Sequence, residues 1–597
     1  MKEENEVLIP AAARPGDNGY AFQPEVDMAK GDLSHGSVAA AFGRLRGWLT
    51  GNRPFWIGAA IFFVVFLITR LPYFLYYRST IMNPDSSGYF MIVDQMNKGF
   101  WPNLSIRTIG YPLFLKVVYL LFSTSFGVAI TQHGITLISR LFFIRAMARA
   151  FPRRPFLPIA ISLGLAGHAA ISWQVLSDSS YMTDSLFTSA IVMTLGLLAL
   201  GLAGRKKSHF VWASLSAAIT VLIRPAGLFL VPILALAVVF MIRNKFGRGP
   251  LIAAVLPCAA VLLAQMSYNA LVIRSFSLSG FSEHALISLT STFLEPDASY
   301  GPTANQAIER CRAVFKDRDR RVLKTSWHPW TINRVFSRYY ESNRSRIAGI
   351  FLAAEPSERY NLYIEWRPLW RRMSRDALRK HPGTALKYIY SNLYRVFVRN
   401  LWNQVDLYQS FRLDGLGDLP KLKMVREFGK PQSGFSRRFN TQAYASTLMP
   451  DVFARTMLPE LYGPDGLPRI LRSARSKRSE GYAVSFPERL HRRLISVHTV
   501  LLRNPGWTLA CLAGWLFSFG CVIRTGFRHR GAFTLFFLTS AALLYGFSVA
   551  VLALPYLRYT YVLEFVYYLS PLIWPIALGL EDDAVPAAAD IRRKTRT

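Results

Sequence analysis

Cysteine is scarce in this sequence. Only four cysteines occur in 597 residues, with no CxxC motif and no cluster with histidine. Three of them, Cys258, Cys511 and Cys521, lie within apolar runs, and Cys311 lies in a polar region. This distribution excludes a zinc knuckle and a framework of disulfides.

Acidic residues are also few. The chain has 36 Asp and Glu against 70 Lys and Arg, for a formal net charge of +34. In a protein with many membrane spans, such an excess indicates contact with anionic lipid or acidic glycan. No basic motif falls in a recognisable cytoplasmic domain, so membrane lipids are predicted partners and nucleic acid is not.

The first 53 residues lack an early apolar core. They are polar and rich in Gly, Pro and Ala, so no cleavable signal peptide is predicted. We expect residues 1–53 to form a disordered cytoplasmic tail, and residues 581–597 to form a second cytoplasmic tail.

Long apolar runs are abundant. Leu251–Ile273 and Ala532–Leu557 carry no charge, and each can cross about 30 Å of hydrocarbon at about 1.5 Å per residue. Nine further runs are Phe55–Tyr77, Gly110–Phe122, Phe126–Ile144, Phe156–Leu176, Ser185–Ala203, Phe210–Ile223, Ala226–Ile242, Trp507–Ile523 and Tyr559–Leu580. The predicted fold class is an all-α polytopic membrane protein.

Basic clusters set the predicted topology. Gly110–Phe122 is short and holds Lys116, so we expect it to lie in the interface rather than span. With that run omitted, the positive-inside rule gives ten spans (range nine to twelve) with both termini inside. The clusters predicted to be cytoplasmic are Arg44 to Arg53, Arg145 to Arg154, Arg205 to Lys207, Arg243 to Arg248, Arg524 to Arg530, and Arg592 to Arg596.

This topology divides the chain into modules. Residues 54–273 form an N-terminal transmembrane module with a first outer loop at 78–109. Residues 274–505 form an extracytoplasmic soluble or interfacial region, and residues 506–580 form the C-terminal spans. In the middle region, residues 354–402 read as amphipathic helices with a basic, aromatic face, which suits either a membrane surface or packing on their own domain.

Acids and arginines gather on the predicted outer side. Asp85 lies in "NPDSSGYF", Asp178 and Asp184 lie in "SDSSYMTDSLF", and Arg224 and Arg558 follow apolar runs. Charges at membrane depth are costly and usually functional. A carboxylate can act as general base toward an acceptor hydroxyl, and arginines can stabilise a departing lipid-linked phosphate. Alternatively, Asp85 and Ser86 only cap a short surface helix over Tyr89–Met96.

The segment "TRLPYFLYYRSTIMNPDSSGYFMIVDQMNKGFWPNLSIRTIGYPLFL" resembles the first outer loop of the membrane-embedded C-type (GT-C) glycosyltransferases. Aminoarabinose transferases of lipid A and protein O-mannosyltransferases belong to that superfamily. "SYMTDSLF" and "VLIRPAGLFLVPIL" resemble its second acidic loop and its basic Gly/Pro turn, while "HPGTALKYI" and "LPYLRYTYVLEF" resemble looser motifs. The resemblance covers about residues 55–275 and, weakly, the last three spans.

The resemblance implies an inverting glycosyltransferase of a bacterial inner membrane with its site facing the periplasm. The donor would be a polyprenyl-phosphate sugar, and the acceptor an envelope lipid, polysaccharide or protein. Asp85 would be the base, and Asp184 a second acid for the acceptor or for a divalent metal shared with Asp85. Arg224 and Arg558 would bind the donor phosphate, and the second-tier residues would be Tyr89, Asp178 and Glu564.

One position departs from the family pattern. Where aminoarabinose transferases carry a Glu before the juxtamembrane helix, this chain has Arg107. Arg107 would suit an anionic donor phosphate or an acidic sugar and makes a metal doubtful, or it only snorkels to the interface. Two other functions stay open, namely a transporter or flippase of a lipid-linked saccharide and a non-catalytic envelope-assembly protein of the same fold.

Overall fold

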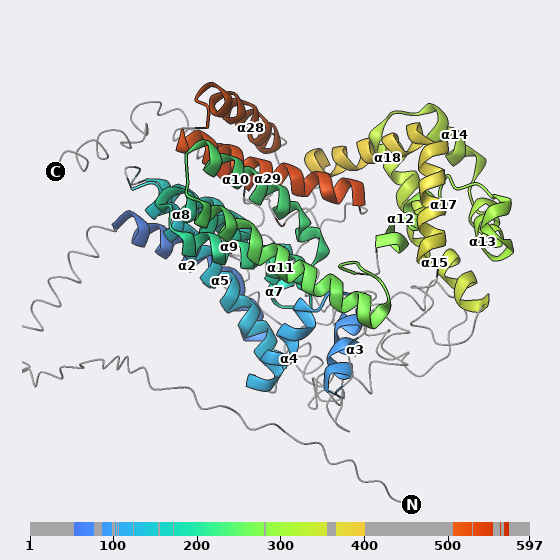
Figure 1. Ribbon diagram of the computed structural model, residues 1–597, viewed down its shortest axis with the longest axis horizontal. Coiled ribbons are helices and arrows are strands. Elements are labelled where there is room, and N and C mark those ends of the chain that lie inside the picture. The colour runs from blue at the N-terminus through green and yellow to red at the C-terminus, as the bar shows by residue number, and fades with distance from the viewer. Residues whose placement is uncertain are drawn as a thin grey trace, which may run out of the picture. The chain divides into compact units, whose positions relative to one another are not determined.

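The computed structural model describes residues 53–76, 86–97, 99, 102, 104, 107–122, 125–152, 154, 156–170, 172–279, 282–354, 366–399, 506–527, 529–552, 562 and 566–571. From Pro54 onward these residues belong to one compact unit. Their secondary structure consists of helices and turns (Figure 1). The predicted all-α fold class is therefore confirmed over the described residues.

The N-terminal half of this unit is a bundle of helices. Its elements are α2 (Arg53–Tyr76), α3 (Ser86–Asn97), α4 (Gly110–Phe122), α5 (Ser125–Ala150), α6 (Leu157–Ala169), α7 (Ser172–Asp178), α8 (Thr183–Gly204), α9 (Lys207–Ile223), the 3-10 helix η1 (Pro225–Phe229), α10 (Leu230–Arg243) and α11 (Arg248–Ile273). Near the C-terminus, α28 (Gly506–Arg524) and α29 (Arg530–Leu552) pack against each other, and α29 also packs on η1 and α10.

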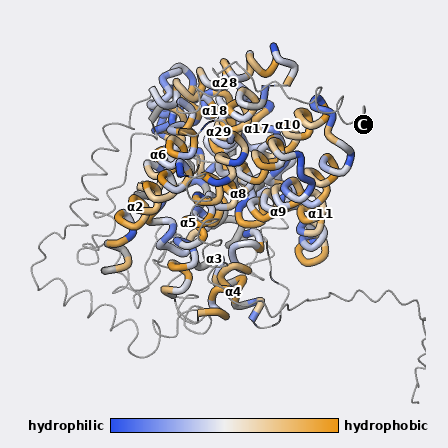
Figure 2. The backbone as a smooth tube through the Cα atoms, turned by 90° about the vertical axis from the view of Figure 1, so that its left-hand side faces the viewer, coloured by the Kyte–Doolittle hydropathy of each residue, from blue (hydrophilic) through white to orange (hydrophobic). Residues whose placement is uncertain are grey.

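Seven helices of the described chain are long and apolar enough to cross a membrane. They cover Arg53–Leu71, Phe126–Ala150, Thr183–Gly204, Pro225–Arg243, Arg248–Ile273, Gly506–Arg524 and Gly531–Ala550. The shorter apolar helices α6 and α9 match two further predicted spans, and α4 matches the run expected to lie in the interface. In Figure 2, α2 and α11 are coloured as hydrophobic along most of their length. The last predicted run, Tyr559–Leu580, lies mostly outside the described residues.

One predicted span is interrupted. The run Phe156–Leu176 was expected to form a single helix, but α6 ends at Ala169 and α7 starts at Ser172. The end of α6 leaves carbonyl groups without helical partners. The buried Arg70 guanidinium donates to the Ala169 carbonyl at 2.5 Å, which stabilises the break. An arginine from another helix thus satisfies a carbonyl at the end of α6, and the local sequence gives little sign of it.

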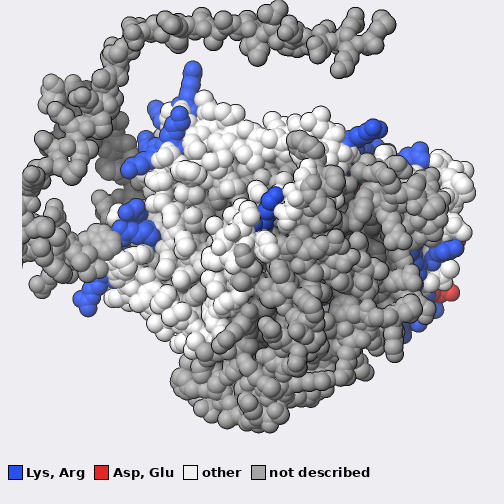
Figure 3. Space-filling view, turned by 90° about the horizontal axis from the view of Figure 1, so that it is seen from below, with Lys and Arg blue, Asp and Glu red and all other residues white. Residues whose placement is uncertain are grey.

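The helix ends that carry predicted cytoplasmic clusters meet at one end of the bundle. The Arg145 guanidinium lies 5.0 Å from an aromatic ring in the first turn of α2. Arg205, just after α8, lies 4.7 Å from the Phe246 ring between α10 and α11. Asn244, just after α10, donates to the Phe527 carbonyl just after α28. On the face drawn in Figure 3, most of the described Lys and Arg side chains lie toward two opposite sides, and one lies near the middle.

The described part of the middle region is helical. It comprises α12 (Ser282–Thr290), the 3-10 helix η2 (Ala298–Tyr300), α13 (Pro302–Ala313), α14 (Asp317–Thr325), α15 (Pro329–Ala354), α17 (Arg367–Lys380), α18 (Pro382–Tyr394) and the π-helix η3 (Arg395–Arg399). Residues of α12, α13, α15 and α17 form one buried cluster, and residues of α12, α14, α15 and α18 form another. The predicted amphipathic character holds for α17, which buries Trp370, Met373 and Ala377 on one face.

A pair of glycines tests the packing of α2 on α6. A Cβ at Gly58 would lie 2.8 Å from the Pro158 carbonyl oxygen, whereas a Cβ at Gly134 would meet nothing within 4 Å. We expect Gly58→Ala to lower the free energy of unfolding by about 1–3 kcal/mol through overpacking. Gly134→Ala should leave it unchanged or raise it by up to about 1 kcal/mol. Denaturant unfolding of the purified protein in detergent measures both. Equal stability of the two variants would contradict the close approach.

Candidate active site

Two predicted site residues form an ion pair. Asp184 lies in the first turn of α8, and Arg224 is the residue that follows α9. The Arg224 Nη1 donates to the Asp184 Oδ1 at 2.6 Å. The Asp184 side chain is 4% exposed and that of Arg224 is 18% exposed. The pair is thus nearly buried but still reaches the surface through the arginine.

The local sequence explains why Arg224 lies there. Pro225 follows it, and a residue before proline avoids the helical region. Arg224 is accordingly extended, with φ −155° and ψ 125°, and the chain turns into η1. A Cβ at Gly227 would lie 2.9 Å from the backbone of Thr220, so the turn folds tightly onto the end of α9. The motif "RPAG" therefore ends α9 with the guanidinium held beside α8.

The loop predicted to be the first outer loop ends at the same place. A Cβ at Gly110, the first residue of α4, would lie 2.6–2.7 Å from the backbone of Leu222 and Ile223, at the end of α9. Only glycine permits so close an approach of two backbones. Arg107, three residues before α4, lies with its guanidinium 5.0 Å from the Tyr89 ring of α3. The end of this loop and the start of α4 therefore lie against the helix end that carries Arg224.

Arg107 also lies near the start of α3. A Cβ at Gly88 would be 3.4 Å from the Arg107 Nε. α3 begins at Ser86, which confirms the short helix predicted over Tyr89–Met96. Asp85 immediately precedes it in sequence and lies outside the described residues, as do Arg558 and Glu564. The structure pairs Asp184 with Arg224 and places Arg107 over Tyr89, and the two pairs are linked through the contact of Gly110 with the end of α9. The roles assigned to these residues stay predictions.

Tyr89 takes part in an aromatic and amide network beneath the loop. Its ring packs edge-on against Tyr111 with centroids 4.7 Å apart. The Tyr111 Oη donates to the Gln132 Oε1 at 2.9 Å. The Gln132 Nε2 in turn lies within hydrogen-bond distance of the carbonyls of Ser177, Asp178 and Ser180. The "GYP" element of α4 therefore helps to fix the turn that leads to Asp184.

Asp178 is a buried centre of hydrogen bonds. It is fully buried at the end of α7. Its carboxylate accepts hydrogen bonds of 2.6–2.8 Å from four helices, through Arg70 of α2, Thr136 of α5, Gln174 of α7 and Ser185 of α8. Burial raises the pKa of the Asp178 carboxyl, but Arg70, His133, Arg140 and the Ser185 hydrogen bond together hold this pKa below its ordinary value. The carboxylate therefore stays anionic, and its contacts favour a positioning role.

Sequence reasoning missed three residues of this network. Arg70, Arg140 and Gln132 are each completely buried. Arg140 donates to Ser189 of α8 at 2.8 Å, and its charge also acts on Asp178. The two arginines fall inside the apolar runs Phe55–Tyr77 and Phe126–Ile144. A single charge inside such a run is itself the signal, because it needs a partner at that depth.

The described residues give little support for a metal site. They contain no group of three or more His, Cys, Asp and Glu side chains that could hold an ion. The Asp184 carboxylate, one of the two predicted ligands, is already neutralised by Arg224.

Comparisons with known proteins give matches only among solved structures. No protein-family model matches the chain, and no curated protein sequence matches it. The chain is similar to the Archaeoglobus fulgidus oligosaccharyltransferase in its apo form, at 12% identity and TM-score 0.33, covering 87% of this chain and 50% of that one. It therefore spans about half the length of that enzyme.

Two further structures are similar. One is the A. fulgidus oligosaccharyltransferase AglB in complex with an inhibitory peptide and a dolichol-phosphate, at 11% identity and TM-score 0.33, covering 88% of this chain and 51% of that one. The other is ArnT from Cupriavidus metallidurans bound to undecaprenyl phosphate, at 12% identity and TM-score 0.27. The match covers 85% of this chain and 77% of that one.

The Arg70–Asp178 pair gives a stability prediction. Each of Asp178→Asn and Arg70→Met leaves a buried group without its partner, and we expect each to lower the free energy of unfolding by about 3–5 kcal/mol. The double variant should lose less than the sum of the two, by about 1–3 kcal/mol. Denaturant titration of the purified variants in detergent measures this coupling. Strict additivity would contradict a direct interaction between the two side chains.

Proposed function

We propose that this protein transfers a sugar from a polyprenyl-phosphate carrier to an acceptor in the cell envelope. The observation that carries the proposal is the nearly buried Asp184–Arg224 pair, with Arg224 partly exposed at the end of α9. This helix end lies against the start of α4 and thus beside the first outer loop. It is the loop whose sequence resembles that of the C-type glycosyltransferases.

The arginines suit a departing phosphate. When the bond between the sugar C1 and the phosphate oxygen breaks, negative charge develops on that oxygen. Guanidinium groups bind phosphate through planar, charge-assisted hydrogen bonds. Asp184 accepts a hydrogen bond from one guanidinium nitrogen of Arg224 and so fixes the orientation of this side chain before the donor binds. Arg107 lies beside α3 and supplies a second cation, and by resemblance Arg558 supplies a third.

Asp85 is the proposed general base. It would take the proton from the acceptor hydroxyl as the acceptor oxygen bonds to the sugar C1 on the side opposite the leaving phosphate, which inverts the configuration. The phosphate stays on the polyprenyl chain, so atoms and charge balance without a general acid. Because Arg224 already neutralises Asp184, we assign Asp184 to orienting Arg224 and route no step through a metal.

A second candidate function is transport of a lipid-linked saccharide. One observation favours it, since Arg140 is fully buried well inside α5 and donates to Ser189 on α8. Buried charges of this kind often mark transport pathways. Transfer is preferred because Asp184, Arg224 and Arg107 are set at helix ends, where a lipid head group and an acceptor from solution can meet.

Single substitutions in a deletion strain test the proposal. With wild type, one defined sugar should appear on an envelope lipid or glycan, measured by mass spectrometry. Asp85→Asn should lower that product by at least about a hundredfold, in line with general-base contributions. Asp184→Asn should lower it by about tenfold or more, because Arg224 loses its orientation. Asp317→Asn, on the exposed first turn of α14, is the matched control and should give wild-type product.

Protein levels and folding must be equal across the variants. If Asp85→Asn restores the full product, Asp85 only caps α3 and the transferase assignment fails. If deletion changes no covalent mass but traps a lipid-linked sugar on one side of the membrane, the transport function takes its place. If activity is lost on chelation and regained with a divalent cation, the transfer depends on a metal, and the role assigned to Asp184 must include binding it.

A further inference from the structure

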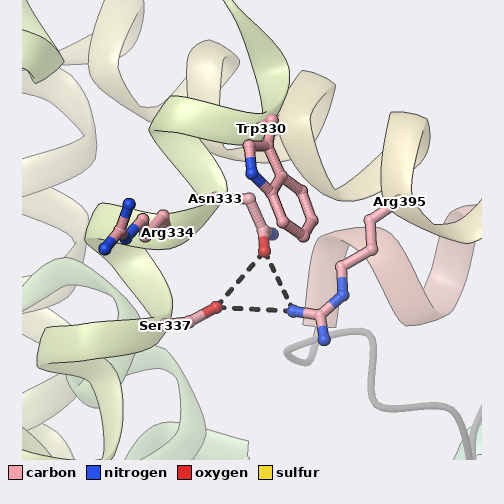
Figure 4. Close-up of a pocket in the computed structure, with 5 residues that line it drawn as sticks. All are labelled: Trp330, Asn333, Arg334, Ser337 and Arg395. Atoms are coloured by element: carbon pink, nitrogen blue, oxygen red, sulfur yellow. Dashed lines mark hydrogen bonds between the residues drawn. The ribbon is translucent and has the colours of Figure 1, made fainter. Parts of the chain in front are cut away.

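A second polar site lies between α15 and η3. It is a cavity of about 320 Å³ lined by Trp330, Asn333, Arg334, Ser337 and Arg395. Figure 4 shows Asn333, Ser337 and Arg395 facing one another, with the Trp330 ring beside Asn333. Among the described residues that line the cavity there are two arginines and no Asp or Glu, which favours an anion. These residues are distinct from the site around Asp184.

Hydrogen bonds give this cavity a defined floor. The Arg395 Nη1 donates to the Asn333 Oδ1 at 2.9 Å and to the Ser337 Oγ at 3.4 Å. The Asn333 Nδ2 donates to the Asn392 Oδ1, and the Asn392 Nδ2 donates to the Ala550 carbonyl at 2.9 Å. Asn333 and Asn392 are both buried. The floor of the cavity is therefore fixed to the end of α29.

This attachment sets the depth of the cavity. Ala550 is the last residue of the apolar span Gly531–Ala550. One turn earlier, a Cβ at Gly546 would lie 2.5 Å from the Phe397 ring of η3, so the two elements touch. The end of a membrane span lies near the level of the lipid head groups. Arg395 is therefore held close to that level.

Exposed aromatic and apolar side chains lie on α18 and beside the first turn of α15. Leu386, Tyr390 and Tyr394 recur every fourth residue along α18 and are 57%, 42% and 37% exposed. Trp330 is 39% exposed, and Trp327 lies with its ring 6.4 Å from that of Tyr390. Trp and Tyr gather where a protein meets the membrane interface. This face, continuous with the end of α29, therefore suits contact with lipid rather than with a soluble partner.

We propose that the cavity binds the phosphate of an anionic phospholipid in the leaflet at the C-terminal end of α29. Arg395 binds the phosphate at the floor, and the exposed Arg334 side chain, which points away from Arg395 in Figure 4, turns to bind it from the rim. Guanidinium groups recognise phosphate oxygens in a planar geometry. Trp330 packs against the glycerol backbone, and the α18 stripe contacts the upper acyl chains. The bound lipid then fastens the middle region to the membrane beside α29, a role separate from sugar transfer.

Photo-crosslinking in a bilayer tests this site. The full chain is reconstituted in nanodiscs that contain photoactivatable phosphatidylglycerol, and the attachment sites are mapped by peptide mass spectrometry. We expect adducts within residues 327–338 and 386–395. Arg334→Gln and Arg395→Gln should each lower their yield by about fivefold or more, as expected for loss of a charge-assisted contact. Arg310→Gln, an exposed arginine of α13 away from the cavity, should leave the yield unchanged.

The arms of the experiment separate the possible ligands. Arg334 is exposed and Arg395 is tied into the floor, so Arg334→Gln keeps the test valid if Arg395→Gln fails to fold. Equal adduct yield in Arg334→Gln and Arg310→Gln would overturn the proposal. Equal labelling by photoactivatable phosphatidylcholine would show that the site does not select anionic over zwitterionic lipid. That result would also overturn the proposal. Suppression by excess inorganic phosphate would assign the cavity to free phosphate instead.

Discussion

The carboxylate of Asp178 is the interaction on which the rest of the bundle depends. One buried anion accepts hydrogen bonds from α2, α5, α7 and α8, and thereby fixes four helices at a single point. An unpaired charge at this depth would cost several kcal/mol, so the arrangement holds only when Arg70 is present. The same arginine ends α6 by binding the Ala169 carbonyl. The position of the turn that leads to Asp184 therefore depends on Arg70 of α2.

The proposed active site is built on top of this buried network. Gln132 holds three carbonyls of the turn after α7, and Tyr111 holds Gln132. Tyr111 belongs to the same short helix whose first residue, Gly110, touches the end of α9. The nearly buried Asp184–Arg224 pair thus rests on a layer of fully buried polar side chains. Such pre-organisation is what electrostatic stabilisation of a leaving group requires.

The sequence predicted the helices well because apolar runs and basic clusters are strong signals. The charge rule predicted that Arg145, Arg205 and Arg243 lie on the cytoplasmic side, which stays a prediction. In the structure, the helix ends near these residues contact other helix ends of the bundle. The charge rule also predicted that Asp184 and Arg224 lie on a common face, though not that they pair. The break between α6 and α7 was not predicted, and the arginine that binds its first carbonyl, Arg70, lies about a hundred residues away in the chain. The cavity beside Arg395 likewise could not be predicted from the sequence, because Asn333 and Arg395 become neighbours only in the folded protein.

The break after α6 has a consequence for the lipid around it. At about 1.5 Å per residue, a helix from Leu157 to Ala169 is about 20 Å long, well short of a hydrocarbon core of about 30 Å. Most of α6 is buried, but Phe156 and Leu163 are 78% and 52% exposed, so we expect this side of α6 to face the acyl chains. A short helix at the rim is matched by thinning of the bilayer next to it. We therefore expect the bilayer to be locally thinner beside α6, so that lipid head groups lie closer to the level of the Asp178 network.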